Sequence, residues 1–142
     1  MFVKHICKKI TEPENFSRWK KRNKGAGWGG FFKTSEHGEL RKCLVEEQLE
    51  MCCYCEVMIS PEDSHIEHLR PKGIPLYRKD MFLYENLLAS CNKKDSCGRL
   101  KGRWYEAEMV SPLDENCEKR LTEKALSGTE RCTHIPTLLI IN

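Results

Sequence analysis

Apolar and polar residues along this chain follow patterns that predict both helices and a short strand. Apolar positions from Glu39 to Met51 recur at helical spacing, with glutamates mostly outside the stripe, which predicts an amphipathic helix. Residues 15–22 predict a shorter helix with a basic face, whose Phe16 and Trp19 either dock on the core or face nucleic acid. Residues 64–69 alternate in polarity and predict a strand that ends before Pro71.

The remaining segments set the expected domain organisation. Residues 25–30 are rich in glycine and predict a linker, and residues 98–105 predict the start of a closing helix. We therefore expect an α+β chain with three parts. These are a basic segment with a linker (1–38), a helix with a metal-braced core (39–105), and an acidic extension that is a candidate partner-binding surface (106–142).

Composition favours a metal as a structural brace. The chain has 142 residues, of which 39% are hydrophobic and 32% charged, so its core is thin. It has nine cysteines, an odd number, and neither an apolar signal segment nor a run long enough to cross a membrane. We therefore expect reduced thiols and a cytoplasmic location. The net charge of +3 is small, but basic residues cluster at 18–24, 70–79 and 93–103, which indicates a surface suited to a phosphate backbone.

Two cysteine pairs predict a structural zinc site. Cys52 and Cys55 have the spacing of a zinc knuckle, and Cys91 and Cys97 supply a second, more widely spaced pair. Four thiolates close a tetrahedral site with no open position, which is the arrangement of structural zinc. Buried thiols or a redox pair are the alternative interpretation. Cys43 lies on the apolar stripe of the predicted helix and is expected to be a core residue rather than a ligand.

The segments around these cysteines resemble a known nuclease family. The resemblance rests on Cys52-Cys53-Tyr54-Cys55-Glu56, on His65-Ile66-Glu67-His68-Leu69-Arg70-Pro71-Lys72, and on Asn86-Leu87-Leu88-Ala89-Ser90-Cys91. Together they are similar to HNH (ββα-metal) endonucleases of the four-cysteine type, and more narrowly to the HNH subunit of Septu-type and retron-linked bacterial antiphage systems. The resemblance implies a small ββα-metal core with flanking N- and C-terminal helices.

The resemblance also implies roles for individual residues. His68 would be the general base, Glu67 would bind a catalytic Mg²⁺ or Mn²⁺, and Asn86 would orient His68. For His65 three roles are expected as alternatives: an extra ligand of that ion, a partner of such a ligand, or a surface residue. The phosphate-binding residues would be basic side chains near the motifs: Arg70, Lys72 and Lys101.

These expectations lead to two hypotheses about function. The first is a metal-dependent DNA endonuclease acting in bacterial antiphage defence, with an ATPase partner subunit and no membrane association. The second is a four-cysteine zinc module that binds nucleic acid or a protein partner and has lost catalysis. The second is suggested by Gly98-Arg99, which stands where the family usually carries a metal-binding His or Asn. The apolar residues 135–142 are expected to be core, an interface, or an aggregation hazard.

Overall fold

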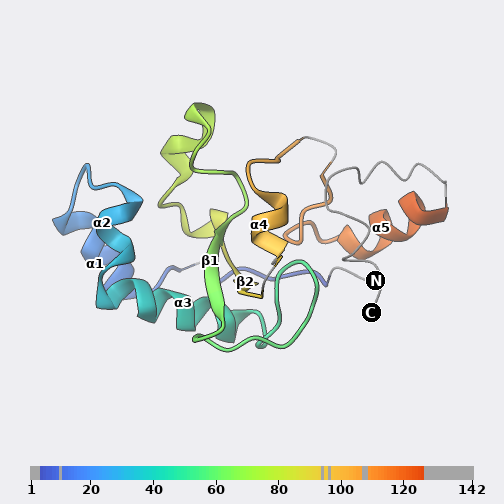
Figure 1. Ribbon diagram of the computed structural model, residues 1–142, viewed down its shortest axis with the longest axis horizontal. Helices are drawn as coiled ribbons and strands as arrows, with labels where there is room; N and C mark the ends of the chain where they lie inside the picture. The colour runs from blue at the N-terminus through green and yellow to red at the C-terminus, as the bar shows by residue number, and fades with distance from the viewer. Residues whose placement is uncertain (1–3, 10, 94, 96, 107–108, 127–142) are drawn as a thin grey trace.

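The computed structural model describes residues 4–9, 11–93, 95, 97–106 and 109–126, and these residues form an α+β fold (Figure 1). The predicted α+β class is confirmed. Two strands, β1 (Ser64–His68) and β2 (Leu87–Cys91), form an antiparallel sheet. The described α-helices are α1 (Glu14–Arg22), α2 (Trp28–Phe32), α3 (Ser35–Glu47), α4 (Cys97–Lys101) and α5 (Cys117–Leu126). Two 3₁₀ helices, η1 (Pro75–Asp80) and η2 (Tyr84–Asn86), lie between the strands in sequence.

The strand pair positions the residues that the sequence singled out. Ser64 pairs with Cys91 and His68 pairs with Leu87, so the two strands are in register along their whole length. The alternation of side chains in β1 directs His65 and Glu67 to one face and Ile66 and His68 to the other. The helix α4 is the next helix after β2, so the two antiparallel strands and this short helix occur in the order β1, β2, α4.

The helix α3 differs in its bounds from the helix predicted at 39–51. Thr34 caps its first turn, since its side chain accepts a hydrogen bond from the backbone N–H of His37. The helix ends at Glu47, because Leu49 and Glu50 adopt left-handed backbone angles that a helix does not continue through. Gln48 is buried at the end of the apolar stripe, where its amide exchanges two hydrogen bonds with the backbone of Ala89.

The prediction of a glycine-rich linker at residues 25–30 is wrong for residues 28–30, which belong to α2. Phe31 of this helix is fully buried and lies 4.6 Å from Trp19 and 5.4 Å from Phe16, measured between ring centroids. Burial of aromatic rings of this size outweighs the entropy that glycine loses in a helix. The predicted helix at 15–22 is confirmed as α1, and its Phe16 and Trp19 point into this aromatic cluster.

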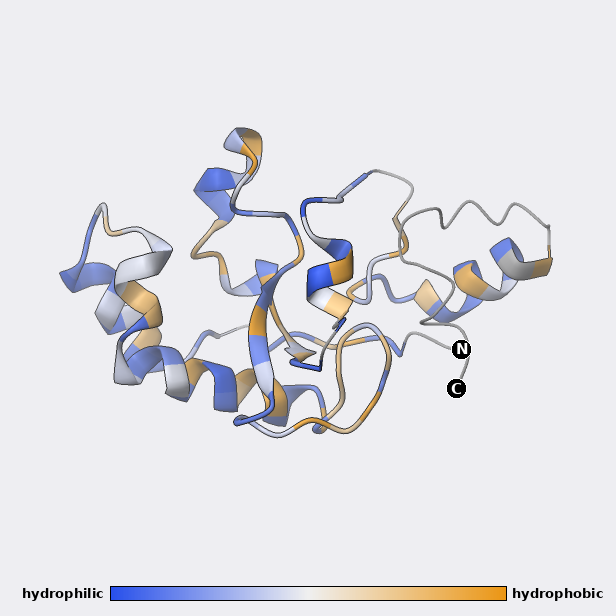
Figure 2. Ribbon diagram, in the orientation of Figure 1, coloured by the Kyte–Doolittle hydropathy of each residue, from blue (hydrophilic) through white to orange (hydrophobic). Residues whose placement is uncertain are grey.

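The predicted boundary between residues 38 and 39 falls inside α3, and α1 packs against α3. Figure 2 shows that α3 is mostly hydrophilic, with hydrophobic residues toward its C-terminal end. Leu44 and Val45 are buried there, whereas Cys43 is only partly buried, contrary to the expected core position. The apolar segment 135–142 lies outside the described residues. Within the described part of the chain, none of the helices is both long and apolar enough to cross a bilayer.

Candidate functional site

The four predicted ligand cysteines come together in one cluster. Cys52 and Cys55 lie in the turn after α3, Cys91 ends β2, and Cys97 begins α4, yet their sulfur atoms all lie within 4.8 Å of one another. The sulfur of Cys91 is 3.7 Å from that of Cys97 and 4.0 Å from that of Cys55. Tetrahedral zinc with bonds of about 2.3 Å places its sulfurs about 3.8 Å apart. The cluster therefore has the dimensions to hold a metal ion such as zinc.

The shifted pKa values of these thiols also favour a bound metal ion. Hydrogen bonds from Cys53, Cys55 and Cys97 lower the pKa of the Cys52 thiol. The hydrogen bond with Cys52 in turn raises the pKa of Cys55 to about 11 and also raises the pKa of Cys97. Thiols this close cannot all ionise without a cation among them, because their negative charges repel. A divalent metal removes that conflict by binding all four as thiolates.

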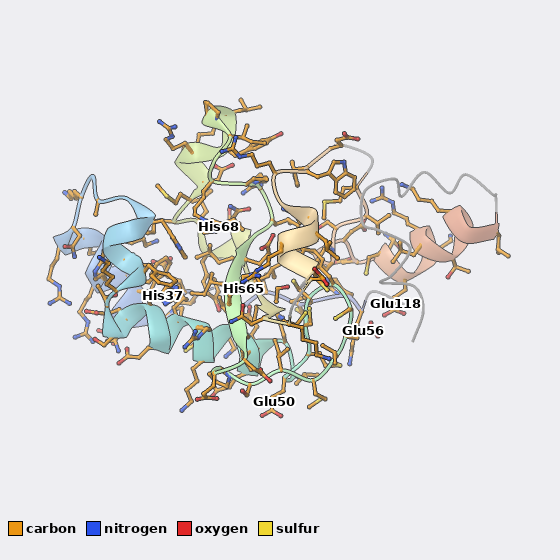
Figure 3. All side chains as sticks on the ribbon, viewed as in Figure 1. His37, Glu50, Glu56, His65, His68 and Glu118 are labelled. Atoms are coloured by element: carbon orange, nitrogen blue, oxygen red, sulfur yellow. The ribbon has the colours of Figure 1, made fainter. Side chains whose placement is uncertain are left out.

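A cleft of about 310 Å³ lies beside the cluster, along β1 and the start of α4. His65, Glu67 and His68 contribute to its wall, and Figure 3 shows both histidines along β1, with His37 on the side of the N-terminal helices. The other lining residues come from β1, from the segment after it, and from α4 with its exit: Ile66, Pro71, Lys72, Gly73, Gly98, Gly102 and Arg103. Residues that sequence motifs placed in different segments thus share one concave surface.

The two carboxylate oxygens of Glu67 have different partners. Oε1 accepts a hydrogen bond from the Tyr54 hydroxyl at 3.2 Å and forms an ion pair with the Lys101 ammonium at 3.3 Å. Oε2 faces Nε2 of His65 at 3.4 Å. Oε1 is therefore held by the protein interior, and Oε2 is the oxygen directed toward the cleft.

Gly98 lets the start of α4 approach this carboxylate. A Cβ atom added at Gly98 would lie 2.4 Å from Nε2 of His65 and 2.6 Å from Oε2 of Glu67. Both distances are shorter than a non-bonded carbon contact, so a side chain at this position would displace His65 or Glu67. His65 thus occupies the space that a residue larger than glycine would need.

His68 is buried between the cleft and the aromatic cluster. Its Nε2 atom lies 3.1 Å from the backbone oxygen of Met81, and its ring packs edge-on against Trp28 at 4.3 Å. Burial, together with the charge of Lys72, lowers the pKa of His68 to about 3. A carbonyl oxygen only accepts hydrogen bonds, so Nε2 carries the proton of the neutral ring and Nδ1 carries the lone pair.

Asn86 is buried and holds the chain after β1. Its Oδ1 accepts a hydrogen bond from the backbone N–H of Arg70, and its Nδ2 donates to the backbone oxygens of Arg70 and Asp80. These bonds tie the end of β1 to the end of η1. Asn86 does not line the cleft, and its hydrogen bonds are made to backbone atoms.

The three expected phosphate-binding cations have different surroundings in the structure. The side chain of Lys101 is fully buried and donates to the backbone oxygen of His68 in addition to its ion pair with Glu67. Arg70 is paired with Asp80 at 2.8 Å. Because an internal carboxylate offsets each charge, these two residues are poorly suited to the role that the sequence suggested. Lys72 lies in the cleft, as a phosphate-binding role requires.

Four residues of the site were not assigned a role from sequence: Tyr54, Trp28, Gly98 and Arg103. Tyr54 lies between Cys52 and Cys55, and this position in the sequence is the signal that could have linked it to the site. Its contact with Glu67, 13 positions along the chain, is seen only in the structure. Trp28 was assigned to a linker. Within the described residues, the four cysteines form the only group of three or more side chains arranged as metal ligands. Among those residues, Glu67 and His65 therefore have no third His, Cys, Asp or Glu side chain beside them as a ligand.

Comparisons with protein-family models, with curated proteins and with solved structures found no match. The geometry of the cysteine cluster and of the adjoining cleft therefore carries the functional argument.

Proposed function

We propose that this chain is a zinc-braced, metal-dependent HNH-type endonuclease that hydrolyses DNA phosphodiester bonds. The observation that carries the proposal is that Glu67 and His68, whose imidazole is neutral, both line one cleft next to the four-cysteine cluster. The order β1, β2, α4 supports the proposal because it is the order of elements in a ββα-metal core. The resemblance to antiphage nucleases extends the proposal to bacterial defence, with an ATPase partner subunit.

His68 would act as the general base. Its low pKa keeps the imidazole neutral at pH 7, so Nδ1 is available to accept a proton from the attacking water. Without substrate, an imidazole with a pKa of about 3 is a weak base and holds an accepted proton poorly. A bound phosphodiester would add negative charge beside the ring and raise that pKa toward neutrality, which couples substrate binding to base strength.

Glu67 and His65 would hold the catalytic Mg²⁺ or Mn²⁺. Oε2 of Glu67 and Nε2 of His65 lie 3.4 Å apart and so could contact one ion, and Mg²⁺ needs few protein ligands because it retains waters. An imidazole ligand favours Mn²⁺ over Mg²⁺, since nitrogen is a softer donor than oxygen. When bound, the ion supplies positive charge to the scissile phosphate and the leaving oxygen.

Cleavage of supercoiled plasmid by the zinc-loaded protein, with Mn²⁺ or Mg²⁺, tests this proposal. Loss of the general base in His68→Ala is expected to slow cleavage by about 10²- to 10⁴-fold. His37→Ala is the matched control, because His37 is also a buried imidazole packed on Trp28 but does not line the cleft. Equal rates in wild type and His68→Ala would reject the mechanism, and equal losses in both variants would indicate damaged packing instead.

A binding module without catalysis is the second candidate, and the Glu67–Lys101 ion pair favours it. The buried ammonium already offsets the carboxylate charge, so it competes with a divalent ion for Glu67. This candidate predicts DNA binding without cleavage at any concentration of Mn²⁺, with the ATPase partner present or absent. A cleavage time course run beside a binding titration separates the two candidates.

A further inference from the structure

We propose that Lys72 and Arg103 form a two-cation clamp that binds the phosphodiester backbone of nucleic acid at this cleft. The clamp deepens the proposed function, on which its connection to hydrolysis rests, but its binding role is testable without any cleavage. Arg103 was not among the phosphate-binding residues expected from sequence.

The clamp residues are the cations of the cleft that internal carboxylates leave available. Among the described residues, neither Lys72 nor Arg103 forms an ion pair with a carboxylate, whereas Arg70 is paired with Asp80 and Lys101 with Glu67. Both side chains are exposed to solvent, and an unpaired cation in a concave surface attracts anions more strongly than one on a flat surface, because the low-dielectric walls focus its field. The cleft therefore presents two positive charges beside Glu67 and His68.

Contacts between two separate segments bring the clamp together. Lys72 follows β1, and Arg103 follows α4 after Gly102, whose backbone angle φ of +53° is left-handed and favours glycine. A Cβ atom added at Gly73 would lie 3.3 Å from Nε of Arg103, so the guanidinium packs directly against the backbone next to Lys72. Tyr77 and Tyr105 pack edge to face at 5.2 Å between the same two segments. Figure 1 shows the segments that follow β1 and α4 on the same side of the fold.

The environment of Lys72 also suits a site that is completed by an anion. Burial and the nearby charge of Lys101 lower the pKa of Lys72, while Glu67 raises it. Its ammonium lies 5.7 Å from the centroid of the Trp28 ring, which keeps it at the cleft wall. A phosphate diester would supply the missing negative charge, and the planar guanidinium of Arg103 presents paired donors to phosphate oxygens.

Fluorescence anisotropy with a labelled duplex oligonucleotide, in buffer without added divalent ions, tests the clamp. Lys72→Gln and Arg103→Gln are each expected to weaken binding by about tenfold. Each is also expected to reduce the slope of log K against log salt by about 0.9. Arg99→Gln is the matched control, since Arg99 is exposed like Arg103 but does not line the cleft. Its affinity is expected to stay within about twofold of wild type.

The possible outcomes separate the clamp from the nuclease. Equal effects of all three substitutions, or absence of DNA binding by the wild-type protein, would overturn the clamp. Displacement of the oligonucleotide by a mononucleotide at an equal phosphate concentration would also overturn it, because the ligand would then be a small phosphate compound. Selective loss in Lys72→Gln and Arg103→Gln supports the clamp even if the plasmid assay detects no cleavage. Plasmid cleavage together with equal binding by all variants would reject the clamp and leave the nuclease proposal intact.

Discussion

The phenolic hydroxyl of Tyr54 donates a hydrogen bond to Oε1 of Glu67 over 3.2 Å, and this bond joins the cysteine knuckle to the cleft. Tyr54 is fixed by its neighbours Cys52 and Cys55, both members of the cysteine cluster. A metal held by that cluster would therefore also fix the orientation of the Glu67 carboxylate. This buried contact connects the cysteine cluster to the cleft.

Removing this hydroxyl in Tyr54→Phe is expected to slow cleavage by about tenfold while zinc content stays unchanged. The carboxylate would lose one of its donors, which costs about 1–2 kcal/mol and permits Oε2 to turn away from His65. Tyr84→Phe is the matched control, since Tyr84 donates to Glu47 at 2.8 Å, outside the cleft. Plasmid cleavage and chemical denaturation measure both effects. A similar loss of activity in Tyr84→Phe would contradict a specific role for Tyr54.

Removal of the metal is expected to destabilise the protein. Purified wild type should contain about one zinc per chain, and a chelator should lower its thermal midpoint, because binding free energy at such a site is also folding free energy. The double variant Cys52→Ser, Cys91→Ser should contain no zinc and show no further response to the chelator. Cys43→Ser, which changes a cysteine outside the cluster, should keep its zinc. Elemental analysis beside thermal melts would reject the site if the double variant retained zinc.

Gly98→Ala is expected to destabilise the protein by about 1–3 kcal/mol, as overpacking does, and to displace His65. The double variant Gly98→Ala, His65→Ala should recover part of that stability, since the clash with His65 is removed. Gly38→Ala is the control, because a Cβ at this position in α3 meets nothing within 4 Å. It should stabilise the protein by about 0.5–1 kcal/mol. Urea denaturation of the four proteins gives these differences, and a neutral effect of Gly98→Ala would contradict the close approach of α4.

His37 is expected to make the stability depend on pH. Burial, with a smaller contribution from Arg41, lowers the pKa of His37 to about 4, below its ordinary value of 6.5. Between pH 6.5 and pH 4 the imidazole is therefore protonated in the unfolded chain but not in the folded one. The stability that the neutral His37 contributes is complete above pH 6.5 and is lost as the pH falls toward 4. The free energy of unfolding should drop by about 1–2 kcal/mol more between pH 7 and pH 5 in wild type than in His37→Gln. Parallel pH profiles for the two proteins would show that His37 remains free to protonate in the folded state.

Features that depend on local pattern could be predicted from the sequence. The helix α1 and the strand β1 are confirmed, because helical and strand periodicity act over a few residues. The four-cysteine cluster is also confirmed: the short spacing within each pair predicted metal ligands, and the fold brings the two pairs together. Zinc, the catalytic ion, DNA and the ATPase partner remain predictions.

The pairing of charges and the burial of aromatic surfaces depend on contacts between distant segments, which the sequence pattern does not reveal. The sequence shows that Arg70 and Lys101 are basic but not which carboxylates they contact. Arg70 pairs with Asp80, 10 positions away, and Lys101 pairs with Glu67, 34 positions away. The helix α2 likewise forms despite its two glycines, because Trp28 and Phe31 both pack against Phe82 from a distant segment. Long-range packing sets which cations are neutralised and which remain for a ligand, because burial and charge pairing outweigh local preference.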